Sequence, residues 1–141
     1  MEQENPQVSG ENVNDSSAPK ILIVDEDIRD LSFHAIPFEA QGFKVYKCSS
    51  YETALRSVER EDFDLAIVDQ GSEGFEGGCV LRHLRRFSPD TPFVVLARIG
   101  DMKCYVFAIE MGAVEYLEKP VAASEMNRMI HDFLRVPVKA A

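Results

Sequence analysis

The stretch KILIVDED, residues 20–27, joins an uninterrupted apolar run to three consecutive acidic residues. The run Ile21–Val24 has no polar position, which is typical of a strand that is buried on both faces of a parallel sheet. Similar apolar runs occur at residues 65–68 and 93–97. These three segments therefore predict the central strands of a sheet that helices cover on both sides.

Two further segments, residues 43–47 and 114–117, alternate between apolar and polar side chains. Alternation indicates a strand with one face toward solvent, so we expect these two strands at the edges of the sheet. Apolar residues at helical spacing follow each strand. These stripes fall within residues 28–38, 51–58, 80–87, 106–111 and 126–134.

This alternation of strands and helices predicts an α/β fold of the (βα)5 type, a doubly wound parallel sheet with right-handed crossovers. With the first, third and fourth strands central and the other two at the edges, the strand order is the 2-1-3-4-5 of flavodoxin-like folds. In such sheets ligands bind beyond the carboxyl ends of the strands, at the switch point between the first and third strands.

The chain has 141 residues, which is enough for one domain with a hydrophobic core. Residues 1–19 contain four acidic residues and no basic residue, and valine is their only large aliphatic type. Such a segment buries too little apolar surface to offset its ordering entropy, so we expect a disordered acidic tail. The folded domain should span residues 20–136, and residues 137–141 should form a short C-terminal tail.

Composition argues against several classes of function. The net charge of −9 repels nucleic acid phosphates. No apolar run approaches the roughly 20 residues that a membrane helix needs, and no signal peptide is evident. The three cysteines are too widely spaced for a zinc site and are expected to be reduced core residues. We therefore expect a cytoplasmic protein with no direct nucleic acid or membrane partner.

Charged side chains follow three of the predicted strands. Asp25, Glu26 and Asp27 come after the first strand, Asp69 ends the third, and Lys119 follows the fifth. The fold brings these positions to one edge of the sheet, where clustered carboxylates repel one another unless a cation neutralises them. Oxygen ligands of this kind suit Mg²⁺, which is therefore the expected cofactor.

Each of these residues also has a simpler structural explanation. Asp27 is suited to cap the first helix, and Asp69 to end a strand with a polar residue. Lys119 would then be a solvated loop residue, and Tyr116 an aromatic residue of an edge strand. These explanations are weaker when taken together, because the acidic residues and the lysine each stand at the expected strand end.

Four segments, ILIVDED, DLAIVDQ, PFVVLARIGD and GAVEYLEKP, resemble successive landmarks of the response-regulator receiver family of two-component signalling. The resemblance covers residues 20–136. It implies that a histidine kinase or phosphotransfer protein transfers a phosphoryl group to an aspartate, with Mg²⁺ as the cofactor. It also implies a signalling protein and not an enzyme, apart from slow removal of its own phosphoryl group.

The resemblance assigns roles to individual residues. By position, Asp69 resembles the phosphoryl acceptor and Lys119 the lysine that contacts the phosphate. Asp25, Glu26 and Asp69 resemble the metal ligands of the family, with the backbone carbonyl of Gly71 as a further ligand.

The switch region departs from the family pattern. Tyr116 resembles the aromatic residue whose rotamer reports activation. Ala97, however, stands where the family has a serine or threonine whose hydroxyl binds the phosphoryl group, and Arg98 stands where a small residue is usual. After the acceptor, Ser72-Glu73 replaces the frequent Met-Pro.

The predicted fourth helix offers a candidate partner surface. Receivers commonly dimerise or bind downstream proteins through the fourth helix, fifth strand and fifth helix. Residues 104–109 are apolar throughout and cannot all face the sheet. We expect Val106, Ile109 and Met111 to lie nearest the core, and Phe107 to be exposed as an anchor for a partner or for a second copy of the chain.

Three functions remain open from the sequence. The first is a phosphoryl-accepting receiver, and the second is a receiver-like interaction module that no longer switches on phosphorylation. The third, a phosphatase of the haloacid dehalogenase type, is disfavoured because Ile28-Arg29 replaces the Gly-Thr of that family. No output domain is visible after Val136, so we expect either action by docking or a piece of a longer regulator.

Overall fold

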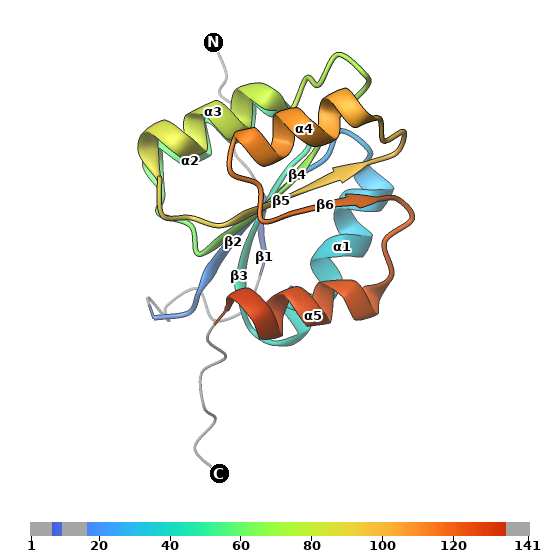
Figure 1. Ribbon diagram of the computed structural model, residues 1–141. Helices are drawn as coiled ribbons and strands as arrows, with labels where there is room; N and C mark the ends of the chain where they lie inside the picture. Colours follow the sequence, from blue (N-terminus) through green and yellow to red (C-terminus); the bar gives the residue numbers. More distant parts are fainter. Residues whose placement is uncertain (1–6, 10–16, 135–141) are drawn as a thin grey trace.

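A computed structural model describes residues 7–9 and 17–134. A six-stranded sheet in the order β1-β3-β2-β4-β5-β6 lies between two layers of helices (Figure 1). The strands are β1 (Gln7–Ser9), β2 (Lys20–Val24), β3 (Lys44–Cys48), β4 (Leu65–Asp69), β5 (Phe93–Ala97) and β6 (Glu115–Glu118). The helices are α1 (Ile28–Ala40), α2 (Tyr51–Arg60), α3 (Gly78–Phe87), α4 (Met102–Glu110) and α5 (Ala123–Phe133).

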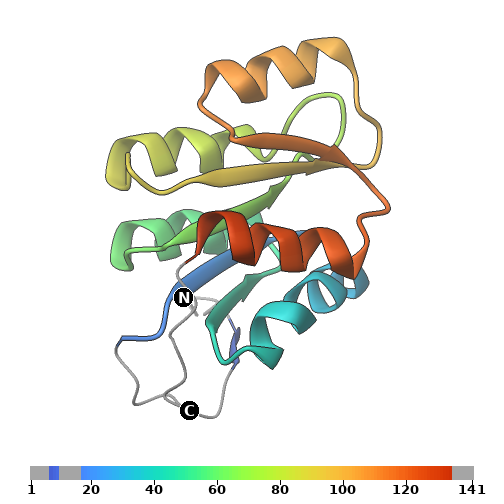
Figure 2. The same ribbon diagram turned by 60° about the horizontal axis from the view of Figure 1, so that its bottom comes forward.

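The parallel part of the sheet confirms the predicted strand order, because β3-β2-β4-β5-β6 is the order 2-1-3-4-5. Every residue of β4 and β5 is buried, as the apolar runs predicted. The last strand, β6, lies at one edge and is mostly half-buried. The helices α1 and α5 pack side by side on one face (Figure 2), and α2, α3 and α4 cover the other. None of the helices in the described part of the chain is long and apolar enough to cross a membrane.

The opposite edge of the sheet differs from the prediction. Residues 7–9 form β1, which pairs antiparallel with β3, so β3 is not an edge strand in the described structure. The disorder expected for residues 1–19 is therefore wrong for these three residues. Strand pairing uses main-chain groups, so a segment poor in apolar side chains can still pair with an open edge. The rest of that tail before Ser17, and the predicted tail at 137–141, lie outside the described residues.

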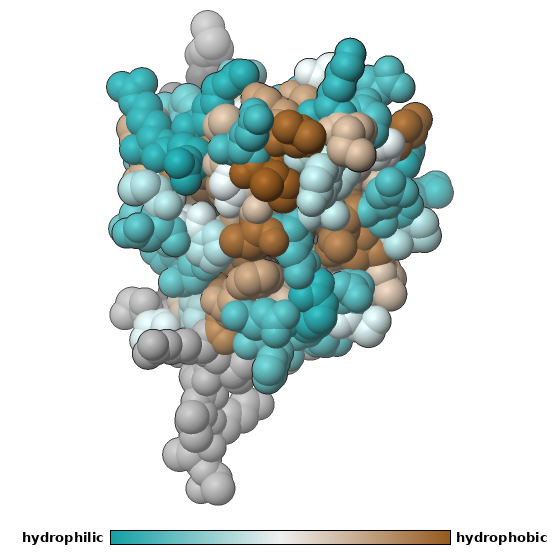
Figure 3. Space-filling view, viewed as in Figure 1, coloured by the Kyte–Doolittle hydropathy of each residue, from teal (hydrophilic) through white to brown (hydrophobic). Residues whose placement is uncertain are grey.

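The orientation of α4 also differs from the prediction. Its buried residues are Cys104 and Ala108, whereas Val106 and Ile109 are each 42% exposed. Small side chains allow the helix to lie close to the sheet, and the large apolar residues then remain outside (Figure 3). Phe107 is half-buried against the core, so its assignment as the exposed anchor is wrong.

Candidate functional site

The carboxyl ends of the parallel strands surround an open cleft of about 600 Å³. Asp25 and Glu26 follow β2, and Asp69 is the last residue of β4. Arg98 follows β5, and Lys119 follows β6. All five line the cleft, so the fold brings together Asp25, Glu26, Asp69 and Lys119, which the sequence predicted at the strand ends, and adds Arg98 to them.

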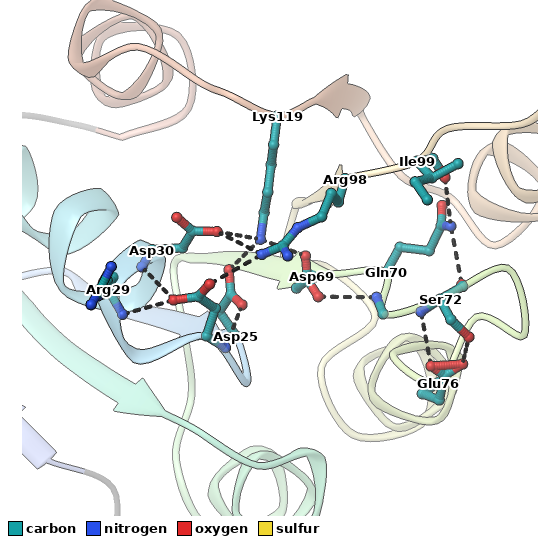
Figure 4. Close-up of polar contacts among 12 residues, drawn as sticks. Asp25, Arg29, Asp30, Asp69, Gln70, Ser72, Glu76, Arg98, Ile99 and Lys119 are labelled. Atoms are coloured by element: carbon teal, nitrogen blue, oxygen red, sulfur yellow. Dashed lines mark hydrogen bonds and ion pairs between the residues drawn. The ribbon is translucent and has the colours of Figure 1, made fainter.

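Lys119 is the centre of the charge network. Its Nζ lies 2.7 Å from Asp25 Oδ2, 2.8 Å from Asp69 Oδ1 and 3.0 Å from Asp30 Oδ2 (Figure 4). Its side chain is only 8% exposed, which excludes the solvated loop charge that was the simpler explanation. Burial alone would lower the pKa of Lys119, but the ion pairs with Asp25, Asp69 and Asp30 raise it above the usual value. The ammonium is therefore charged at neutral pH.

Asp25 is the most deeply buried acid of the site, at 2% exposure. Its Oδ1 accepts a hydrogen bond of 2.9 Å from the backbone N–H of Asp27. Burial raises the pKa of Asp25, Lys119 opposes this shift, and the charge of Asp69 adds to it. The site thus holds a desolvated carboxylate beside a second one, an arrangement that additional positive charge stabilises.

The loop after β4 fixes the carboxylate of Asp69. Its Oδ1 is paired with Lys119, and its Oδ2 accepts a 3.0 Å hydrogen bond from the N–H of Gly71. Gly71 has a φ of +87°, a conformation that favours glycine. The chain also approaches closely at Gly77, where an added Cβ would lie 2.2 Å from the carbonyl oxygen of Asp69. The acceptor candidate is therefore held from several sides while it still lines the cleft.

The predicted metal ligands are only partly brought together. Asp25 and Asp69 share the ammonium of Lys119, whereas Glu26 is exposed. Among residues 7–9 and 17–134, no three Asp, Glu, His or Cys side chains stand close enough together to hold a metal ion as they are. The oxygen donors suit a hard cation in kind, but Glu26 would have to turn toward the other two acids.

Two further acids, Asp27 and Asp30, belong to the site, although the sequence analysis gave neither a role as phosphoryl acceptor or metal ligand. Asp27 lines the cleft. Asp27 caps α1, as its simpler explanation predicted, by accepting from the N–H groups of Arg29 and Asp30. Asp30, in the first turn of that helix, pairs with Lys119. Arg98 Nη2 lies 3.1 Å from Asp27 Oδ2 and 3.6 Å from Asp30 Oδ2. An acid one turn into the helix after an acidic strand end was the sequence signal for Asp30.

The switch positions are connected through Gln70, which sequence reasoning missed. The hydroxyl of Tyr116 donates to Gln70 Oε1. Gln70 is fully buried, and its Nε2 donates to the carbonyl oxygens of Ser72 at 3.1 Å and of Ile99 at 3.3 Å. Ala97 is buried and contributes only its carbonyl, which accepts from the N–H of Lys119 at 2.8 Å. No sequence signal beyond its place after Asp69 indicated this role of Gln70.

The sequence is similar to a known protein family and to several characterised proteins. The family model of the response regulator receiver domain matches residues 21–131. The transcriptional activator protein PfeR of Pseudomonas aeruginosa is 32% identical over 131 residues, covering 88% of this chain and 42% of PfeR. The C4-dicarboxylate transport transcriptional regulatory protein DctD of Rhizobium meliloti is 30% identical over 112 residues, covering 79% and 24%. The chain thus spans less than half the length of these curated relatives.

Solved structures agree with this fold. A CheY-like response regulator receiver domain protein from Methanospirillum hungatei has a TM-score of 0.75 at 26% identity, covering 81% of this chain and 91% of that one. A response regulator from Thermotoga maritima has a TM-score of 0.73 at 27% identity, covering 83% and 98%. The family model matches well over half of the sequence, and the strand order agrees with the fold of these structures. This chain belongs to the response regulator receiver domain family.

Proposed function

We propose that Asp69 accepts a phosphoryl group from the phosphohistidine of a histidine kinase or phosphotransfer protein. A carboxylate oxygen of Asp69 attacks the phosphorus, the P–N bond to the imidazole breaks, and an acyl phosphate forms. The observation that carries this proposal is the position of the Asp69 carboxylate. It borders an open cleft, and its Oδ1 lies 2.8 Å from the Nζ of the buried Lys119. A carboxylate so placed has room for an incoming phosphoryl group and a cation ready to pair with it.

Lys119 has two roles in this proposal. Before transfer it holds Asp69 in place through the same ion pair that offsets the charge of the neighbouring acids. After transfer its ammonium donates to an oxygen of the phosphoryl group. Because the side chain is almost fully buried, this pairing is screened little by salt.

A divalent cation, most simply Mg²⁺, fits the acids of the site. Asp25, Asp69 and Glu26 would hold it, with the carbonyl of Gly71 as a further ligand. The raised pKa of Asp25 supports this proposal, because it reflects buried negative charge that a cation offsets. When bound, the cation supplies positive charge that neutralises the phosphoryl oxygens.

The signal would pass to a downstream protein or a second copy of the chain through the face formed by α4, β6 and α5. Large apolar residues are exposed on that face, including Met102, Tyr105, Val106 and Ile109 of α4. With a net charge of −9, we do not expect direct binding to nucleic acid. A cytoplasmic location follows if the phosphodonor is a histidine kinase.

Beryllofluoride, which mimics an acyl phosphate, tests this function directly. With Mg²⁺ present, it should shift the backbone amide signals of the loops after β2 and β4, and Asp69→Asn should abolish the shifts. Asp90→Asn, at an exposed position after α3, is the matched control and should respond as the unmodified chain does. If the unmodified chain does not respond, the protein is an interaction module that no longer switches. A response that persists in Asp69→Asn would mean that another residue is the acceptor.

A further inference from the structure

Arg98 is the second cationic side chain of the cleft. Among the residues that the structure describes, only Lys119 and Arg98 are basic residues lining it, opposite several acids. Arg98 follows β5, two residues beyond Leu96, the register partner of Asp69. Figure 4 shows its side chain extending from this strand end toward the carboxylates around Lys119. Its position therefore places five N–H donors at the mouth of the site.

The contacts that Arg98 makes are weak ones. Its Nη2 lies 3.1 Å from Asp27 Oδ2, and the arginine side chain is 64% exposed. The two backbone hydrogen bonds that Asp27 accepts as the cap of α1 both go to its Oδ1, so the cap does not depend on Arg98. The Oδ2 that Arg98 contacts belongs to a side chain that is 37% exposed, so water can solvate this oxygen when Arg98 leaves. Exposed ion pairs of this kind contribute little to stability, and a more highly charged partner would displace Asp27.

Lys119 can offer the phosphoryl group only the N–H that now pairs with Asp69, because Asp25 and Asp30 occupy its other two donors. An ammonium carries three N–H donors, and three carboxylates, Asp25, Asp30 and Asp69, each lie within 3.0 Å of this one. A phosphoryl group on Asp69 would add a charge of about −1.5 to −2 and three acceptor oxygens. Ala97, at the end of β5, has no side-chain donor to offer. With one N–H of Lys119 facing three acceptor oxygens, the phosphorylated site would therefore have too few side-chain donors unless another group moved in.

We propose that Arg98 is a phosphate-binding residue of this site. Its guanidinium leaves Asp27 and donates to the phosphoryl oxygens on Asp69, in place of a hydroxyl that Ala97 cannot supply. This inference rests on the proposed function of Asp69. Guanidinium groups bind phosphate oxygens in a two-pronged fashion, so one residue satisfies two acceptors and offsets one negative charge.

The affinity for beryllofluoride, measured by amide signals at saturating Mg²⁺, tests the proposal. Arg98→Ala should weaken binding about tenfold, as expected for the loss of one charged hydrogen-bonding partner. Arg98→Lys keeps the charge but loses the planar geometry, so its affinity should be intermediate. Arg29→Ala is the matched control, because it removes the same charge from an exposed position near the cleft that does not line it. Arg29→Ala should change the affinity for beryllofluoride less than about twofold, because the lost charge acts on the site only through solvent-screened electrostatics.

A second readout separates phosphate binding from a structural role. Binding of Mg²⁺ alone should be unchanged or slightly tighter in Arg98→Ala, because a positive charge leaves the neighbourhood. Adding Ala97→Thr to Arg98→Ala should recover part of the lost beryllofluoride affinity by restoring a donor at the end of β5. Arg98→Gln replaces Arg98→Ala if the alanine variant lowers the melting temperature.

Two results would overturn the inference. Beryllofluoride affinity that is unchanged or higher in Arg98→Ala would make Arg98 a bystander or an obstruction to the cleft. Weaker binding of both Mg²⁺ and beryllofluoride would mean that Arg98 only maintains the shape of the site. If the unmodified chain does not bind beryllofluoride, the proposed function of Asp69 fails, which is a separate and distinguishable outcome.

Discussion

The hydroxyl of Tyr116 donates a hydrogen bond to the side-chain amide oxygen of Gln70, the residue directly after Asp69. The other end of that amide bonds to the carbonyl oxygens of Ser72 and Ile99, which belong to the loops after β4 and β5. Tyr116 is thereby joined to both loops that border the cleft, through contacts that do not involve the side chain of Ala97.

A double-mutant cycle with Gln70→Leu and Tyr116→Phe should reveal this connection. Gln70 is fully buried, so each single change leaves a polar partner without its hydrogen bond. We expect a coupling of about 1 kcal/mol in the free energy of unfolding, measured by urea denaturation. Strictly additive effects would show that the bond between the two side chains contributes nothing.

Phe107 should behave as a core residue. Its ring packs edge-on against the ring of Phe75, with 4.9 Å between the ring centroids, and the guanidinium of Arg82 lies over it. Phe107→Ala should lower the free energy of unfolding by about 2 kcal/mol, because it removes half-buried apolar contacts. Ile109→Ala, on the exposed side of the same helix, is the control and should cost clearly less. Equal losses in the two variants would contradict the orientation of α4.

Asp25→Asn should stabilise the protein when divalent cations are removed with a chelator. The carboxylate is buried beside Asp69, and the amide avoids the cost of that charge. We expect a gain of about 1 kcal/mol in the free energy of unfolding at neutral pH. Mg²⁺ should then stabilise the unmodified chain but not Asp25→Asn. Asp30→Asn also removes a partner of Lys119 from a less buried position and should give no gain. A less stable Asp25→Asn in the chelator would count against this account.

His34 should make stability depend on pH. It is 3% exposed, and its Nδ1 has no hydrogen-bond partner among the residues that the structure describes. Burial, together with the charge of Lys119, lowers the pKa of His34, although Asp30 and Asp69 oppose the shift. Below the unfolded pKa of about 6.5, the unfolded chain takes up a proton that folded His34 resists, so its stabilising contribution is lost as the pH falls.

Thermal or urea unfolding at pH 7 and pH 5 measures this effect. The unmodified chain should lose about 1 kcal/mol more than His34→Gln between these two values. His131→Gln changes an exposed histidine and should leave the pH dependence as it is. The idea fails if His34→Gln and the unmodified chain have the same pH dependence.

Much of the fold followed from the sequence because burial on both faces leaves a strand such as Ile21–Val24 without polar positions. The convergence of Asp25, Asp69 and Lys119 followed in turn from parallel strand order, which brings carboxyl ends to one edge. Contacts that depend on the direction of a side chain were harder to predict from the sequence. Gln70 joins Tyr116 to the carbonyl oxygens of Ser72 and Ile99, and its residue type and spacing did not indicate these contacts.

The errors have physical causes as well. On α4, the buried stripe was assigned to large apolar residues, but the short side chains of Cys104 and Ala108 allow closer packing against the sheet. Residues 7–9 pair with β3 through their backbone, which a prediction based on side-chain composition does not register. In both cases the prediction relied on the hydrophobicity of the side chains, whereas side-chain size or backbone hydrogen bonding decided the structure.

The most direct test of the central claim is the intact mass of the protein after incubation with phosphoramidate and Mg²⁺. The account predicts a gain of one phosphoryl group in the unmodified chain and none in Asp69→Asn, with the fold of that variant preserved by circular dichroism. A full mass gain in Asp69→Asn, or no gain in the unmodified chain, would contradict the assignment of Asp69 as the phosphoryl acceptor.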